Sequence, residues 1–581
     1  MLEINSQTLS CYNVTRKGKR REMAHVRSIW KEGLKIGLIG GAVESLLALI
    51  GMVEAFSQRD IVSDVFSMGQ SLLLIVPIFM GFLVAKRTDR SHPWKGIANS
   101  LFSGFIVGVI VSLLAILGSL VRLRAVFINA SPALFEQLTF KQGLTGGIPL
   151  LLGTGALAGL LAGLLYLTPR LPRRMLITAL GGVIFTGVLQ DLLRPTFAAW
   201  GPIATINDWL FAANGLTLHG AVSVFVLISA IVFSWAKQGE QVRLSVRRLS
   251  PSSQRAVRIT SLSLIVIVLL ALPQILGLFL SEVLTIVGLF VLMGLGLNIV
   301  VGYAGLLDLG YVAFYAIGAY TVAVLTSPEL GFFNLSFWEA LPFAIAMGVI
   351  SGVLLGIPVL KMRGDYLAIA TLGFGEIIRI LVLSDFLRPW LGGAQGIAKI
   401  SKPSVAGIEL ASPQQIYYLI LGGCLLVAFI AWRLRDSRLG RAWMAMREDE
   451  DVAQAMGINL VATKLLAFAT GAAFSALSGA IFASKLGTVY AHSFNVMISI
   501  NILCVIIVGG MGSIPGVILG AIALVGLPEL LREFAEYRLL VYGAALVAVM
   551  LLRPEGLWPE AVRRRELQET RVTGTGPSPS S

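Results

Sequence analysis

Apolar segments of about twenty residues, separated by short basic clusters, recur along nearly the whole chain. A helix needs roughly 20 apolar residues to cross the hydrocarbon core of a bilayer. Of the 581 residues, 56% are hydrophobic and 13% are charged, whereas a soluble domain carries about 25% charged residues. This pattern excludes a soluble globular enzyme and predicts an all-α polytopic membrane protein.

Applying the length criterion along the chain predicts about 16 transmembrane helices. About six are expected in the first 240 residues and about ten after them. The predicted spans lie near residues 34–53, 66–85, 97–121, 143–167, 175–193, 218–236, 259–280, 282–302, 307–326, 339–360, 366–386, 414–432, 463–486, 496–511, 514–530 and 538–552.

Basic clusters follow every second predicted span in the first part of the chain, at Lys86–Lys95, Arg170–Arg174 and Lys237–Arg248. Cytoplasmic loops of membrane proteins carry an excess of Lys and Arg. We therefore expect a multi-pass protein of a bacterial inner membrane with both termini in the cytoplasm. The net charge of +14 is interpreted as contact with anionic lipids, and no nucleic acid is expected as a partner.

Composition also divides the chain into parts. Residues 1–240 form a predicted membrane extension of about six helices with no recognised role, and residues 241–258 form a basic cytoplasmic linker. Residues 259–560 hold the remaining spans, and residues 561–581 are expected to be a disordered cytoplasmic tail. Residues 1–33 are polar and basic, so we interpret them as a cytoplasmic tail rather than a signal peptide.

Sequence patterns typical of catalysis are missing. The full sequence contains no GxxxxGK[ST] phosphate loop, no HExxH and no GxSxG. Its scattered His and Cys residues do not have the spacing of metal ligands. We therefore predict no catalytic residue, no metal and no cofactor bound by this chain. If the protein uses ATP, another chain hydrolyses it.

The segment after Arg433 is the longest charged stretch between the predicted spans. Its basic half, Arg438–Arg447, precedes an acidic run, Glu448–Asp451, that we expect to be solvent-exposed. Residues 451–456 are predicted to form a short helix that Gly457 ends as a C-cap. Such a helix can seat in a groove of a partner, and a solvated amphipathic connector is the open alternative.

This segment resembles the cytoplasmic coupling loop of ABC-importer permeases, although the leading Glu-Ala-Ala of that motif is missing. Three further stretches closely resemble the LivM-type permease of branched-chain amino acid ABC importers, over roughly residues 260–560. They are Gly296–Tyr320 (GLNIVVGYAGLLDLGYVAFYAIGAY), Gly364–Arg379 (GDYLAIATLGFGEIIR) and Gly509–Ala521 (GGMGSIPGVILGA). The resemblance implies an ABC-importer permease fold for residues 259–560.

The resemblance also implies function and partners. Permeases of this family move branched-chain or related amino acids into the cytoplasm by alternating access. The implied partners are two ATPase subunits that use ATP, a LivH-type permease and an extracytoplasmic solute-binding protein. That protein would dock on the outer loop Leu387–Pro413, for which a plain connector is the alternative. The residues assigned to the coupling loop are Arg438, Arg441, Arg447, Glu450, Ala453, Ala455 and Gly457.

Glycines and charges inside the spans supply candidates for the translocation pathway. A Val-Gly-x-x-Gly pattern occurs at Val301 and again at Val508. Paired Gly-interrupted segments can mark broken helices along a pathway, and close helix packing is the alternative. Glu376 and Arg379 can pair on one helix, either as a polar point or gate on the pathway or as an ion pair that fixes helix orientation. The pathway candidates are Asn298, Gly302, Gly305, Asp308, Glu376, Arg379, Gly509 and Gly512.

Three other functions stay open at this point. One is a permease for urea or short amides, which close relatives of the family handle. The others are a membrane scaffold, whose first helices sense or assemble partners, and a secondary transporter. The loop that ends at Gly457 favours the ABC permease over the last two.

The orientation of the chain is testable with reporters that are active only in the cytoplasm. Because Arg-rich segments flank both ends of the spans, a reporter at Ser581 or in the linker 241–258 should be active. The same reporter in the outer loop Leu387–Pro413 should be inactive. An inactive reporter in the linker would show that the assignment of six preceding spans is wrong.

Overall fold

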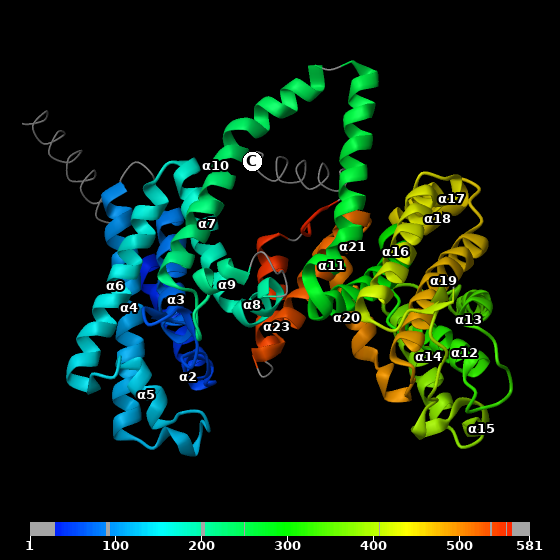
Figure 1. Ribbon diagram of the computed structural model, residues 1–581, viewed down its shortest axis with the longest axis horizontal. Helices are drawn as coiled ribbons and strands as arrows, with labels where there is room; N and C mark the ends of the chain where they lie inside the picture. Colours follow the sequence, from blue (N-terminus) through cyan, green and yellow to red (C-terminus); the bar gives the residue numbers. More distant parts are fainter. Residues whose placement is uncertain are drawn as a thin grey trace, which may run out of the picture. The chain divides into compact units, whose positions relative to one another are not determined.

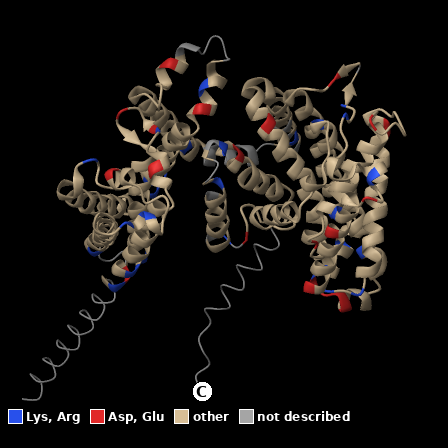
Figure 2. Cartoon of the chain, turned by 90° about the horizontal axis from the view of Figure 1, so that it is seen from below, with Lys and Arg blue, Asp and Glu red and all other residues tan. Residues whose placement is uncertain are grey.

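The computed structural model describes residues 30–88, 93–198, 204–248, 250–405, 407–534, 537–553 and 555–559. The chain divides into two compact units, Met1–Ser261 and Leu262–Ser581 (Figure 1). The predicted tail 561–581 and nearly all of the predicted tail 1–33 lie outside the described residues. Figure 2 shows mostly uncharged ribbon along the helices, with charged residues concentrated towards helix ends and loops.

The described part of the first unit consists of helices and one short hairpin of antiparallel strands. A helix over 30–49 begins its described part. The elements that follow are α2 (Met52–Phe56), β1 (Asp60–Val62), β2 (Phe66–Ser67), α3 (Met68–Arg87), α4 (Pro93–Leu120), η1 (Leu123–Ala125), α5 (Pro132–Leu138), α6 (Gly143–Leu167), α7 (Arg170–Val188), α8 (Gln190–Ala198), α9 (Ala204–Leu210) and α10 (Leu218–Arg248).

Helices α4 and α6 pack closely because glycines face glycines across their contact. A Cβ on Gly104 would overlap the carbonyl oxygen of Gly155, and a Cβ on Gly159 would overlap the carbonyl oxygen of Ser100. Small residues let two membrane helices approach until their backbones touch. The hydroxyl of Ser100 also donates to the carbonyl of Gly81 on α3 over 2.9 Å, which ties a third helix to the pair.

The second unit contains a further short strand pair, β3–β4, among its helices. Its elements are α11 (Pro251–Leu297, which begins before the unit boundary), the π-helix η3 (Asn298–Tyr303), α12 (Val312–Thr326), α13 (Phe337–Val359), α14 (Asp365–Leu383), α15 (Arg388–Leu391), η4 (Gly393–Gln395), β3 (Ser404–Val405), β4 (Ile408–Glu409), α16 (Pro413–Arg435), α17 (Arg438–Glu448), α18 (Glu450–Ala455), α19 (Leu460–Leu486), η5 (Ala491–Ser493), α20 (Val496–Gly509), α21 (Ile514–Ala521), the π-helix η6 (Ile522–Gly526), α22 (Leu527–Leu530), η7 (Arg532–Phe534) and α23 (Arg538–Leu552).

Helix α19 forms the centre of the second unit, and most of its residues are buried. Glycines of α12 and α13 pack against its small side chains. A Cβ on Gly318 would overlap the carbonyl oxygen of Ala476, and Gly352 lies against Phe468 and Ala472. A buried, small-faced helix of this kind lets several neighbours pack around it. The second unit is thus built around one inner helix that sets the positions of the others.

The structure differs from the predicted spans at α11, which joins the two spans expected near 259–280 and 282–302. Together with η3 it forms an apolar helical stretch, Ser263–Tyr303, of 41 residues, about twice the length that one crossing needs. Gly277 interrupts it with non-helical angles (φ 75°, ψ −171°). Because a glycine has no Cβ, it adopts this conformation without the steric cost that other residues meet.

Eleven described helices are long and apolar enough to cross a membrane, and three shorter apolar helices accompany them. The protein is therefore an α-helical polytopic membrane protein, as predicted. The stretch predicted as a linker, 241–258, is largely helical, because α10 runs to Arg248 and α11 starts at Pro251.

The glycine contact between α4 and α6 gives a stability prediction. Gly159→Leu should destabilise the first unit by about 2–3 kcal/mol, because overpacking a tight contact forces the backbones apart. Gly153→Leu on the same helix is the matched control, since a Cβ there meets nothing within 4 Å. Thermal unfolding in detergent micelles measures the difference. Equal melting temperatures for the two variants would contradict the close contact.

Candidate functional site

Helices α17 and α18 form the predicted coupling loop, and side chains cap both helices at their N-termini. The Ser437 hydroxyl accepts from the Gly440 amide over 3.1 Å at the start of α17. Asp449 begins α18, where its Oδ1 accepts from the amides of Asp451 and Val452 over 2.9 and 3.0 Å. A carboxylate at this position satisfies free amides and complements the positive end of the helix dipole.

Gly457 ends α18 in a Schellman motif. Its amide donates to Gln454 over 3.0 Å, and the amide of Ile458 donates to Ala453 over 3.1 Å. The φ of Gly457 is +87°, a conformation that side chains disfavour. The predicted helix end at a left-handed Gly457 is therefore confirmed, and the helix, Glu450–Ala455, begins and ends one residue earlier than predicted. A Cβ at Gly457 would meet no atom of this chain within 4 Å, so backbone strain alone opposes its substitution here.

The inner face of this loop is anchored on α19. Trp443 is fully buried and donates its Nε1–H to the carbonyl of Thr463 over 2.9 Å. Met446 and Ala453 are buried beside it. The outer face is apolar and exposed at Val452 (59%) and Met456 (79%). These two residues were not among the predicted site residues, although their i, i+4 spacing is a signal for one helix face.

Glu450 corrects the expectation that the whole acidic run is solvent-exposed. Its side chain is 18% exposed and lies 2.9 Å from Nζ of Lys464, which is 4% exposed. Arg363, in the loop between α13 and α14, also contacts Glu450, at 3.0 Å. The sequence could not show this pairing because Lys464 and Arg363 lie in other elements. Glu448 and Asp451 are exposed, as expected.

Asp451 forms a second, exposed ion pair with Arg363. The guanidinium approaches its Oδ1 to 2.7 Å. This hydrogen bond favours the ionised carboxylate, so it lowers the pKa of Asp451. The same bond raises the pKa of Arg363. Arg363 therefore joins α18 to the loop that precedes α14.

Arg447 joins the coupling loop to the first glycine-rich stretch. Its Nη1–H donates to the carbonyl of Gly302 in the π-helix η3 over 2.6 Å. Gly305 has a φ of +72°, and a Cβ there would collide with the Arg447 side chain. The other two arginines predicted for this loop, Arg438 and Arg441, are exposed. Arg441 donates to the carbonyl of Asp436 over 2.9 Å.

The two glycine-rich stretches meet inside the second unit. The amide of Gly512 donates to Oδ1 of Asn298 over 2.8 Å, and a Cβ on Gly302 would approach that amide to 2.8 Å. Both stretches are also breaks in helices: η3 is a π-helix, and α20 ends at Gly509 before Gly510 turns to a φ of +121°. The structure thus shows both helix breaks and close packing at these glycines, and their role in a translocation pathway stays a prediction.

Asp308 lies in the irregular segment between η3 and α12 and is fully buried. Its Oδ1 accepts from the amide of Gly310 over 2.9 Å. The neighbouring amide of Leu309 donates to Oγ1 of Thr371 on α14 over 3.0 Å. The segment that Arg447 contacts at one end is thus bonded to α14 at its other end.

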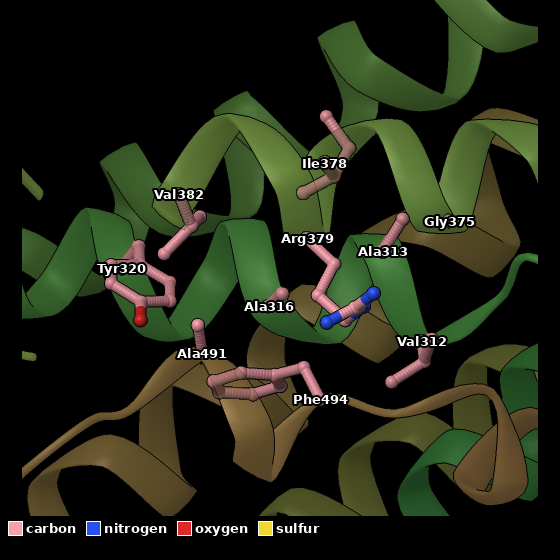
Figure 3. A pocket seen from close by; sticks show the side chains of 10 residues that line it. All are labelled: Val312, Ala313, Ala316, Tyr320, Gly375, Ile378, Arg379, Val382, Ala491 and Phe494. Atoms are coloured by element: carbon pink, nitrogen blue, oxygen red, sulfur yellow. The ribbon is translucent and has the colours of Figure 1, made fainter. Parts of the chain in front are cut away.

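Glu376 and Arg379 pair on α14, where Nε and Nη2 of the arginine each lie 2.8 Å from Oε2 of the glutamate. Their side chains are about one-third exposed. Figure 3 shows the Arg379 guanidinium pointing into a pocket between α12, α14 and the segment around Phe494. The cavity there measures about 10 Å³, which is room for about one water molecule.

Comparison with known proteins shows that part of the second unit is similar to one protein family. Residues 279–550 match the family described as the permease component of the branched-chain amino acid transport system. The chain is 42% identical over 269 residues to the high-affinity branched-chain amino acid transport permease LivM of Escherichia coli, covering 42% of this chain and 62% of that protein. It is 24% identical over 266 residues to the probable LivM of Methanocaldococcus jannaschii (42% and 74% covered).

A third relative is the LivH permease of Escherichia coli, 28% identical over 196 residues, which cover 31% of this chain and 62% of LivH. The chain thus spans less than two thirds of the length of the Escherichia coli LivM and LivH that it matches. No solved structure matches it. The predicted resemblance to LivM-type permeases is confirmed for residues 279–550, and residues 1–278 lie outside the matched segment.

The buried ion pair gives a second stability prediction. Glu450→Ala should destabilise the second unit by about 3 kcal/mol, because it leaves the Lys464 ammonium buried without its carboxylate. Glu448→Ala, at an exposed position of the same acidic run, should cost less than about 0.5 kcal/mol. Thermal unfolding of both variants in detergent gives the comparison. A Glu450→Ala protein as stable as Glu448→Ala would show that Lys464 does not depend on this pair.

Proposed function

We propose that this chain is the permease subunit of an ABC importer that moves branched-chain or related amino acids into the cytoplasm. The match of residues 279–550 to that permease family carries the proposal. The relatives that it resembles are permeases of branched-chain amino acid transport systems. Transport would proceed by alternating access, driven by ATP hydrolysis in separate subunits. This chain itself would be no enzyme and would bind no cofactor.

The finer architecture is part of the same proposal. We propose about 16 crossings and an ABC-importer permease fold for residues 259–560. The described helices support this count if α11 makes two crossings around Gly277, and the helix over 30–49 and the three shorter apolar helices make one each. Residues 1–240 would form a separate membrane extension, residues 241–258 its connection on the cytoplasmic side, and residues 561–581 a tail on that side.

The contact between Arg447 and Gly302 supports a mechanism that couples ATP hydrolysis in the partner subunits to movement of the helices in this chain. In the proposed importer, α18 presents Val452 and Met456 to an ATPase subunit. A movement of α17 and α18 acts on Gly302 through the 2.6 Å bond from Arg447. The segment after Gly302 holds Asp308 and is bonded to Thr371 on α14. Closure of the ATPase dimer would therefore shift α14 relative to α12.

The proposed complex contains partners of four kinds. Two ATPase subunits would bind the loop around α18, and a LivH-type permease would complete the transmembrane part. An extracytoplasmic solute-binding protein would dock on the outer loop Leu387–Pro413, where Trp390, Val405 and Ile408 are exposed apolar residues. Anionic lipids of the bacterial inner membrane would contact the basic clusters, and both termini would be cytoplasmic.

The coupling role of α18 is testable by co-purification. The double variant Val452→Asp/Met456→Asp should lose the ATPase subunits, because it places two charges in the apolar face that the ATPase would bury. The complex should retain less than about a tenth of its ATPase partner, as expected when association weakens by more than about 1.4 kcal/mol.

Val405→Asp on the outer hairpin is the control, because this exposed residue lies in the predicted outer loop and should not affect ATPase binding. Leucine uptake into reconstituted vesicles gives a second measurement for Val452→Asp/Met456→Asp, compared with the wild type. If Val452→Asp/Met456→Asp keeps its ATPase and its uptake, α18 is not the coupling element.

A further inference from the structure

In the ion pair on α14, one nitrogen of the arginine and one oxygen of the glutamate form no hydrogen bond with any described residue. Both bonds from Arg379 go to Oε2 of Glu376, through Nε and Nη2. Within the described part of the chain, neither Nη1 of Arg379 nor Oε1 of Glu376 has a hydrogen-bonding partner. The pair therefore offers one cationic donor and one anionic acceptor side by side on a membrane-spanning helix. Charged side chains within membrane-spanning segments are costly and usually face protein or a water-filled path.

The pocket beside this pair combines an apolar wall with one further polar group. Figure 3 shows Arg379 pointing into it among the side chains of Val312, Ala316 and Phe494. Tyr320 on α12 lines the same pocket, is 5% exposed, and has a hydroxyl without a hydrogen-bonding partner in the described part of the chain. A buried hydroxyl normally has a partner, so its position fits a ligand that would provide one.

We propose that Glu376 and Arg379 bind the two charged groups of a zwitterionic α-amino acid during transport. Arg379 receives the carboxylate, for which a guanidinium is the preferred partner, and Glu376 receives the ammonium. The apolar wall around Val312, Ala316 and Phe494 receives an aliphatic side chain. Tyr320 offers its hydroxyl to a polar group of the passing solute. This inference rests on the proposed function and names the group in the pathway that recognises its substrate.

The pocket is closed in this structure. A cavity of about 10 Å³ holds one water and no amino acid, so α14 must move away from α12 before the solute enters. The hydrogen bond between Leu309 and Thr371 can transmit a movement of Arg447 to α14, because it attaches α14 to the segment that Arg447 contacts. The ion pair then acts as a gate: its charges pair with each other when the pocket is closed and with the solute when it opens.

An ion pair that only orients α14 makes a different prediction. Such a pair is dispensable when both charges are removed together, because two neutral amides leave no unpaired charge in the membrane. The decisive variants are therefore Arg379→Gln, Glu376→Gln and the double variant Glu376→Gln/Arg379→Gln. Each is made in the full chain and purified with its ATPase and permease partners in reconstituted vesicles.

Uptake of labelled leucine and ATP hydrolysis are measured together. Arg379→Gln and the double variant should each lose at least about tenfold in leucine uptake, the scale of one charge-assisted hydrogen bond. Hydrolysis stimulated by the loaded binding protein should persist, since the coupling loop is unchanged. Wild-type uptake in Arg379→Gln, or recovery of uptake in the double variant, would overturn the proposal.

Arg379→Lys and Tyr320→Phe are milder substitutions, which test the proposal even if the Gln variants fail to fold. Arg379→Lys keeps the charge but loses the fork of donors, so it should raise the leucine concentration needed for half-maximal uptake. Tyr320→Phe removes only the hydroxyl and should raise this leucine concentration less than Arg379→Lys does. If the Gln variants do not assemble and Arg379→Lys behaves like the wild type, the proposal is also overturned.

Glu529 and Arg532 provide the matched control, because they form another i,i+3 ion pair in the same unit, at 3.7 Å. Arg532→Gln should leave leucine uptake unchanged, and a tenfold loss there would make the Arg379 result non-specific. Uptake by the wild-type complex distinguishes a failure of the proposed function from a failure of this inference. Failure of the wild type to import any branched-chain amino acid would refute the proposed function, whereas import by both wild type and Arg379→Gln would refute only this inference.

Discussion

The break in the backbone between η3 and α12 depends on hydrogen bonds that other elements supply. Irregular backbone at membrane depth is tolerated only where protein or enclosed water satisfies its polar groups. Here Arg447 donates to the carbonyl of Gly302, Thr371 accepts from the amide of Leu309, and Ser499 accepts from the amide of Val312 over 2.9 Å. The segment is therefore held by α17, α14 and α20 at once, and a shift of any of these helices must change its hydrogen bonds.

This arrangement joins the loop that contains α17 and α18 to the two glycine-rich stretches of the second unit. Arg447 and Gly302 are 145 residues apart in sequence, and Asn298 and Gly512 are 214 apart. Packing against the small face of α19 fixes the helices that carry them. Because a close-packed interior changes between discrete arrangements rather than deforming continuously, a movement of α17 would be transmitted to α14 as a step.

The first unit shares the packing principle but has a different element order. Its α4 and α6 approach through opposed glycines, as α12 and α13 approach α19 in the second unit. Glu44 in its first described helix is 4% exposed, and its Oε2 has no hydrogen-bonding partner within the described part of the chain.

The sequence by itself determined the membrane class, most of the spans and the C-cap at Gly457. These properties follow from local composition and from backbone conformation, which depend on residues near in sequence. The similarity of residues 279–550 to a permease family was also recognisable from motifs such as Gly364–Arg379. The tertiary structure decided which residues meet. It paired Glu450 with Lys464, placed Arg447 on Gly302, and brought the pocket beside Arg379 against Tyr320 and Phe494. These contacts join elements far apart along the chain, and only the packing of whole helices determines their register.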